Sequence, residues 1–120
     1  MKIAIPVDNN SMETGICMSF GRTLWFLIYD TVTEEKNFIN NSASASQGGA
    51  GIKAAQTLVD NKIEAALMPR CGQNAADVFN AANIKIYKTK NLVLNENIKA
   101  FLDGELPLLE EIHEGFHKHS

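Results

Sequence analysis

The sequence predicts a three-layer α/β domain built on a mixed five-stranded sheet. Two observations lead to this prediction. Strand-like and helix-like segments alternate after residue 48, and two strand-like segments before that point form a hairpin. Hairpin partners run antiparallel, whereas each strand–helix–strand unit returns the chain in the same direction. The 120 residues, 45% of them hydrophobic, fit a single domain over 1–120.

The first half of the chain predicts a strand, a loop and a β-hairpin. Apolar residues alternate over Ile3–Val7, which is typical of a strand. The continuous apolar run of Leu24–Asp30 favours a strand that is buried on both faces and antiparallel to the first. Lys36–Asn40 is expected to be its hairpin partner, and the small residues of 41–47 predict a linker.

A helix and a strand are expected next. Gly48–Gly51 precedes apolar residues at helical spacing, and the helix is expected to end at Asn61. The apolar segment Ile63–Met68 then predicts a strand, which Pro69 stops. Because a helix joins them, this strand should run parallel to the first strand of the chain.

The remaining segments repeat the pattern. Asn74 is expected to cap a second helix, and Asn83 to end it in a left-handed conformation. Ile84–Tyr87 alternates as a further parallel strand. Two last helices are expected, one capped by Asn95 and one beginning at Pro107.

Composition excludes several functional classes. The net charge is −3 and there is no basic run, which argues against nucleic-acid binding. No apolar stretch approaches the ~20 residues of a membrane span. We therefore expect a cytoplasmic protein whose two cysteines, Cys17 and Cys71, are thiols rather than a disulfide.

Cys71 is the most informative candidate. It follows a predicted strand and precedes a predicted helix, where ligands bind in open α/β sheets. Free amides at a helix N-terminus favour an anion or a thiolate, and Arg70 adds positive charge. We expect Gly72 and Asn74 to belong to the same site, and Cys71 to be an acidic thiol. A small half-buried thiol at a turn is the simpler interpretation.

Cys17 lies in the loop after the first strand, beside the soft donor Met18. Loops that leave neighbouring strands at one sheet edge could bring Cys17 and Cys71 together as ligands of a soft metal. Two thiolates are fewer than an iron–sulfur cluster usually needs, so a further ligand would be required. The alternative is a loop cysteine without a ligand.

Two other features have weaker signals. The glycines of Gly48–Gly51 would let the backbone approach an anion, although such runs are often hinges and match no nucleotide motif. His113 and His117 have a spacing that allows metal binding, and His119 follows, but a frayed tail is favoured there.

Three stretches together resemble one family, the dinitrogenase iron–molybdenum cofactor biosynthesis proteins, including NifX-like and NafY-like domains. The segment from Ser19 to Asp30 resembles the family's H-F-G-R-A-x-x-F stretch and the strand after it. Gly49 and Gly51 match its G-x-G helix start. The segment 71–87 is similar to its G-x-N-A-x-x-x-L-x-x-A-G-I-x-V-Y pattern, and the resemblance covers roughly residues 1–106.

The resemblance implies a ribonuclease H-like fold and, in some members, the binding of iron–sulfur or molybdenum-containing clusters. Ser19 stands where the family usually has a histidine, and Asn83 replaces a glycine. We expect a carrier, not an enzyme, that binds an anionic cluster and exchanges it with a donor or acceptor protein. The expected site residues are Cys17, Ser19, Arg22, Gly49, Gly51, Arg70, Cys71, Gly72 and Asn74.

Two alternatives remain open at this point. A metal-free regulatory module that binds a small molecule or an anion would use the same glycines and helix ends. A thiol enzyme with Cys71 as nucleophile is disfavoured, because no general base is visible near it in the sequence. The sequence also leaves open whether the protein forms a homo-oligomer.

Overall fold

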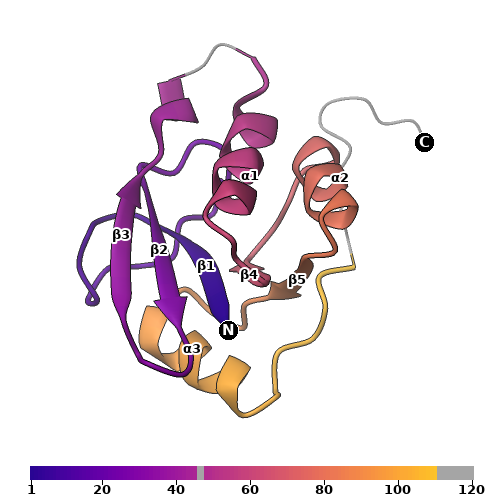
Figure 1. Cartoon of the computed structure of the whole chain (residues 1–120). Coiled ribbons are helices and arrows are strands. Elements are labelled where there is room, and N and C mark those ends of the chain that lie inside the picture. The colour runs from indigo at the N-terminus through magenta and orange to yellow at the C-terminus, as the bar shows by residue number, and fades with distance from the viewer. Residues whose placement is uncertain (46–47, 111–120) are drawn as a thin grey trace.

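A computed structural model of the chain describes residues 1–45 and 48–110 (Figure 1). The strands are β1 (Lys2–Val7), β2 (Trp25–Asp30), β3 (Lys36–Asn40), β4 (Ala65–Met68) and β5 (Lys85–Lys88). The helices are the 3-10 helix η1 (Ser42–Ala45) and the α-helices α1 (Ala50–Asp60), α2 (Gln73–Ala81) and α3 (Leu94–Leu102). Every helix in these described ranges is too short or too polar to cross a membrane.

The five strands form one mixed sheet in the order β3-β2-β1-β4-β5. β1 and β4 are parallel, as are β4 and β5, whereas β2 is antiparallel to both of its neighbours, β1 and β3. This arrangement confirms the predicted hairpin and the two predicted crossovers. The register also confirms the hairpin partner, since Phe38 lies opposite Leu27.

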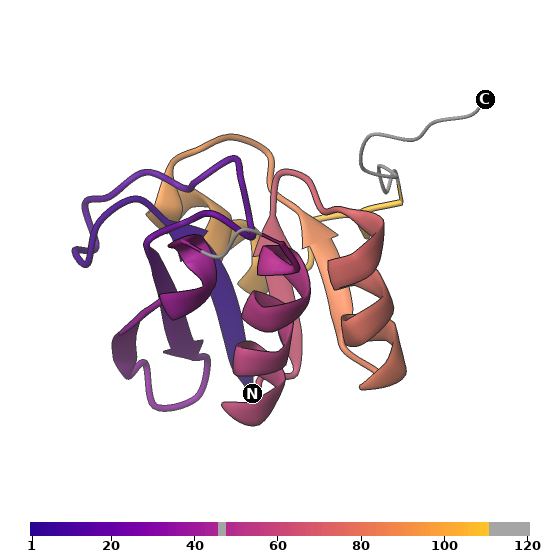
Figure 2. The same ribbon diagram turned by 90° about the horizontal axis from the view of Figure 1, so that it is seen from above.

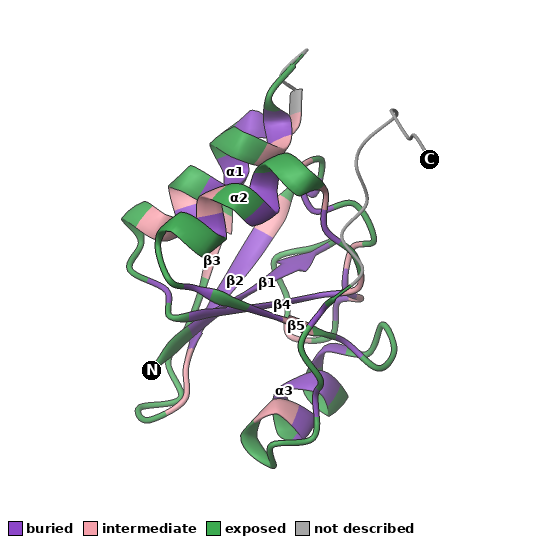
Figure 3. Cartoon of the chain, turned by 90° about the vertical axis from the view of Figure 1, so that its right-hand side faces the viewer, coloured by how far each residue is buried: buried purple, intermediate pink, exposed green. Residues whose placement is uncertain are grey.

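The sheet lies between two helical layers. α1 and α2 lie side by side on one face, and α3 covers the other (Figures 2 and 3). The core on the α1/α2 face includes Phe26, Leu58 and Phe79, and the core on the α3 face includes Ile5 and Leu94. The three-layer α/β prediction is therefore confirmed.

Helix ends differ from the sequence prediction at several positions. α2 begins at Gln73 after the extended Gly72, so Asn74 lies inside the first turn and caps nothing. α3 begins at Leu94 and its N-cap is Val93, so the predicted cap Asn95 lies inside the first turn. The left-handed Asn83 is confirmed by its φ of 60°. Residues 42–45, predicted as linker, form η1 instead.

The predicted helix from Pro107 is wrong over the described residues. Leu108 forms an antiparallel bridge with Tyr87. The Lys88 N–H donates to the Pro107 carbonyl at 2.8 Å, and the Leu109 N–H donates to the Ile86 carbonyl at 2.8 Å. These bonds satisfy backbone groups on the outer edge of β5, where an extended segment pairs better than a helix. The three histidines lie outside the described residues.

Candidate functional site

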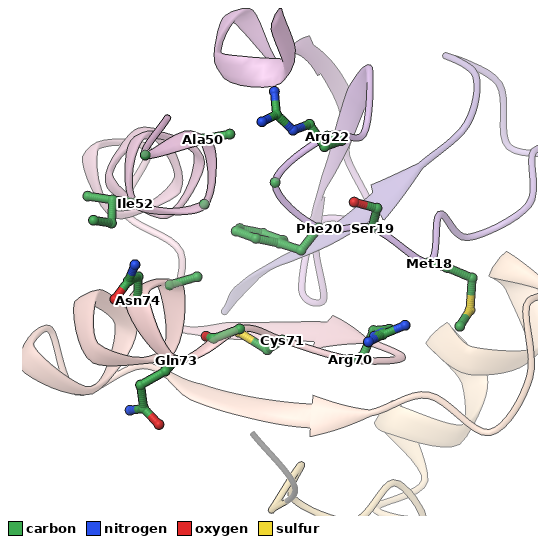
Figure 4. A pocket seen from close by; sticks show the side chains of 15 residues that line it. Met18, Ser19, Phe20, Arg22, Ala50, Ile52, Arg70, Cys71, Gln73 and Asn74 are labelled. Atoms are coloured by element: carbon green, nitrogen blue, oxygen red, sulfur yellow. The ribbon is translucent and has the colours of Figure 1, made fainter. Parts of the chain in front are cut away.

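A cleft of about 590 Å³ opens at the carboxyl ends of β1 and β4 (Figure 4). Its walls are the loop after β1, the start of α1 and the start of α2. This is the edge at which open α/β sheets bind ligands. The lining residues are Met18, Ser19, Phe20, Gly21, Arg22, Gly49, Ala50, Gly51, Ile52, Arg70, Cys71, Gly72, Gln73, Asn74 and Ala75.

The cleft brings together most of the residues predicted from the sequence. The predicted residues on its wall are Ser19, Arg22, Gly49, Gly51, Arg70, Cys71, Gly72 and Asn74. Cys17 does not line it. Sequence reasoning missed Phe20, Gly21, Ala50, Ile52, Gln73 and Ala75 as wall residues, and it named Met18 only as a neighbour of Cys17. The first two lie between predicted site residues, so their position in the loop could have indicated them.

Two helix N-termini meet at this cleft without a side-chain cap. Gly49 precedes α1 in a left-handed conformation with φ 70°, and Gly72 precedes α2 in an extended one. The first hydrogen bond within α1 runs from the Lys53 N–H to the Gly49 carbonyl, and the first within α2 runs from the Ala76 N–H to the Gly72 carbonyl. The amides before them have no intrahelical acceptor, and neither first turn contains an acidic residue. Both helix ends are thus suited to an anion.

The loop that forms the third wall is anchored in the core by Phe20. Its side chain is 5% exposed, and its ring centroid lies 5.2 Å from that of Phe26 and 5.5 Å from that of Phe79. Phe79 belongs to α2, so one aromatic side chain connects the loop to both the sheet and a helix of the cleft. This packing fixes the neighbouring Ser19 and Gly21 at the rim.

Asn41, which is buried, holds the same loop from behind. Its Nδ2 donates to the carbonyl of Gly21 at 3.2 Å and to that of Thr23 at 2.8 Å, while its Oδ1 accepts from the Ala43 N–H. Every polar atom of this side chain is therefore used. The loop and the chain leading to α1 are joined through it.

The two arginines of the cleft differ in their partners. Arg22 donates through Nη1 to the Ser44 carbonyl at 3.0 Å, so its guanidinium also braces η1. Arg70 is exposed and forms no ion pair with any residue of 1–45 or 48–110. Arg70 can consequently turn toward a bound anion without breaking an ion pair within those ranges.

Cys71 lies on the cleft wall but belongs to the core, with 1% of its surface exposed. Burial raises the pKa of its thiol to about 12. The prediction of an acidic Cys71 thiol is therefore wrong. The cause is desolvation, which penalises the charged thiolate in the core. The Sγ donates to the Gly72 carbonyl at 3.4 Å.

Cys17 is half-buried, with its Sγ donating to the Ser19 carbonyl at 3.6 Å. Both cysteines are free thiols, as predicted. Within the described ranges, no group of three or more His, Cys, Asp or Glu side chains is arranged to hold a metal ion. The shared soft-metal site of Cys17 and Cys71 remains a prediction.

Solved structures with this architecture are known. The chain matches the apo form of the orange protein from Desulfovibrio gigas with a TM-score of 0.83 and 27% identity, over 90% of this chain and 92% of that one. It matches the Thermotoga protein TM1290 with a TM-score of 0.82 and 29% identity, over 95% of this chain and 97% of that one. The fold thus defines a class of small α/β proteins of nearly equal length.

The sequence identifies the family within that class. The family model described as "Dinitrogenase iron-molybdenum cofactor" matches residues 1–104. The uncharacterised protein MJ0580 of Methanocaldococcus jannaschii is 33% identical over 113 residues, which is 92% of each chain. The chain therefore belongs to the dinitrogenase iron–molybdenum cofactor family, which confirms the resemblance.

Proposed function

We propose that this protein is a non-enzymatic carrier that binds an anionic iron–sulfur or molybdenum-containing cofactor in the cleft. The observation that supports this most directly is the convergence of two uncapped helix N-termini and Arg70 on one cleft, in a member of this family. Its place would be in cofactor biosynthesis or delivery in the cytoplasm. A cluster donor or acceptor protein would be its partner.

The residues of the cleft fit an anion better than a bare metal ion. The uncapped helix starts at Gly49–Ile52 and Gly72–Ala75 offer backbone amides as donors to an anion, and Arg70 offers positive charge. Cys71 is a neutral thiol at physiological pH, so its coordination to metal would first require loss of a tightly held proton. The cargo is therefore expected to arrive with most of its own metal ligands, and the protein to supply hydrogen bonds and charge.

A second function is favoured by the same cleft. A regulatory module that binds a metal-free anion needs amides and an arginine but no metal ligands. No three-ligand group for a metal occurs among residues 1–45 and 48–110, which is compatible with such a module. The two functions differ in what remains bound after purification under anaerobic conditions.

Anaerobic reconstitution with iron and sulfide tests the carrier function. The carrier proposal expects visible absorption and metal that stays with the protein after desalting, and less of both in Arg70→Gln. Lys62→Gln is the matched control, because Lys62 is an exposed cation beyond the far end of α1. Absence of absorption and metal would reject an iron–sulfur cargo. Saturable binding of inorganic phosphate alone would then support the anion module.

A further inference from the structure

The two edge strands of the sheet differ in whether another segment pairs with their outer side. β5 is covered on its outer side by the segment around Leu108, through the backbone bonds of Lys88 and Leu109. β3 is the other edge strand, and no segment of 1–45 or 48–110 pairs with its outer side (Figure 1). An uncovered edge offers backbone donors and acceptors to another strand.

The register shows which residues of β3 present those groups. The Asp30 N–H donates to the Glu35 carbonyl at 3.0 Å, and the Asn41 N–H donates to the Leu24 carbonyl at 2.9 Å. Hydrogen-bonded and non-hydrogen-bonded pairs alternate along an antiparallel ladder. Lys36, Phe38 and Asn40 therefore direct their backbone N–H and C=O groups away from β2.

The outer edge also has few of the features that normally prevent strand pairing. β3 contains no proline and one charged residue, Lys36. Phe38 and Ile39, on opposite faces of the strand, are half-buried. Phe38 packs against the core on the α3 face and ends that core at the edge of the sheet.

We propose that β3 pairs antiparallel with β3 of a second copy, around a two-fold axis at Phe38. Of the registers that pair outward-facing groups, this one uses the whole strand. It places Phe38 opposite Phe38, and Lys36 opposite Asn40, so no like charges face each other. The sheet and the core on the α3 face would continue across both copies. No residue of the cleft takes part, so the inference goes beyond the proposed function and does not depend on it.

Sedimentation equilibrium of the full chain, up to millimolar concentration, tests this pairing. Asn40→Pro removes an N–H that points away from β2, so the hairpin keeps its backbone bonds while two intermolecular bonds are lost by symmetry. The bond from Asn40 Nδ2 to the Leu24 carbonyl at 3.4 Å is lost in the proline and alanine variants alike. We expect the dissociation constant to rise about tenfold or more. Asn40→Ala keeps the N–H and should stay close to the wild type.

Charge at the same position tests the register. Asn40→Asp would face Lys36 of the second copy and should tighten the dimer, whereas Asn40→Lys should weaken it. Both shifts should shrink at high salt. A chain that stays monomeric up to millimolar concentration overturns the proposal, as do equal constants for the proline and alanine variants. Shifts of the same sign for Asp and Lys overturn the register. Metal reconstitution is not needed for any of these measurements, so their failure would leave the carrier proposal intact.

Discussion

Gly21 lies close against the backbone of Gly51, with no room for a side chain between them. A Cβ at Gly21 would lie 3.0 Å from the Gly51 nitrogen and 3.1 Å from the Gly51 Cα. The loop after β1 and the first turn of α1 therefore meet backbone to backbone at the cleft. Gly51 is close to α2 in turn, with its own missing Cβ 3.6 Å from the Ala75 Cβ. The relative positions of the three cleft walls depend on these two glycines.

Gly21→Ala should open this contact. The neighbouring atoms are backbone and cannot move cheaply, so we expect a loss of about 1–3 kcal/mol in the free energy of unfolding. Retention of a reconstituted cargo should also fall, since the loop and α1 are pushed apart. Urea unfolding and metal content after desalting measure the two effects. Gly48→Ala is the control, because a Cβ there meets nothing within 4 Å. Equal behaviour of the two variants would contradict the proposed role of the contact.

Cys71 should resist alkylation at neutral pH. Its raised pKa keeps the thiol protonated, and burial restricts access. We expect iodoacetamide to modify Cys17 well before Cys71 in the native protein, with both reacting alike after unfolding. Mass spectrometry of the Cys17→Ser and Cys71→Ser variants reads each remaining thiol separately. Faster native reaction at Cys71 would show that the thiol is exposed or acidic after all.

The same thiol should make stability fall at alkaline pH. The folded pKa of about 12 is above the unfolded value near 9, so the folded state holds the proton more tightly. This contribution is fully present below pH 9 and is lost as the pH rises toward 12, at about 1.4 kcal/mol per pH unit. Urea titrations at pH 8 and pH 10 should show a steeper loss for the wild type than for Cys71→Ala. Parallel losses in both proteins would mean that other groups cause the decline.

Phe20→Ala should destabilise the protein by about 3–5 kcal/mol, because it leaves a cavity between the sheet and α2. The loop would also lose its anchor, so binding in the cleft should weaken even where the chain remains folded. Thermal unfolding gives the first quantity and metal retention the second. Phe20→Leu is a useful comparison, since it keeps an apolar side chain at the anchor and should restore most of the stability. A stable Phe20→Ala variant that retains metal normally would show that the loop is held by other contacts.

Much of the fold could be predicted because its determinants are local. The alternation of Ile3–Val7, the polar turn before Lys36–Asn40 and the helical spacing after Gly51 specify the strands, hairpin and first helix directly. The helix starts were harder. Asn74 has the side chain of a cap, yet Gly72 supplies the extended backbone two residues earlier. The preference of a residue type for the N-cap position cannot show which of several nearby residues adopts the extended backbone of an N-cap.

The predicted site residues gathered at one cleft because topology alone places the loops after parallel strands at one edge. The raised pKa of the Cys71 thiol could not be predicted in the same way. A helix end and an arginine are visible in the sequence, whereas the packing of the thiol into the core depends on residues distant along the chain. Pro107 shows the same limit, since its segment is fixed by pairing with β5 and not by its own preference.

The pairing of Leu108 with Tyr87 also bears on where the folding unit ends. The family match stops at residue 104, but the chain seals the outer side of β5 only with the residues that follow. A fragment cut at the family boundary would leave the Lys88 N–H and the Ile86 carbonyl without their acceptor and donor, beside apolar side chains newly exposed to water. Within the described residues, such a fragment would expose the outer sides of both edge strands, β3 and β5, so copies of it could pair strand to strand into long arrays. The segment after Gly104 thus protects the molecule from open-ended strand pairing between copies.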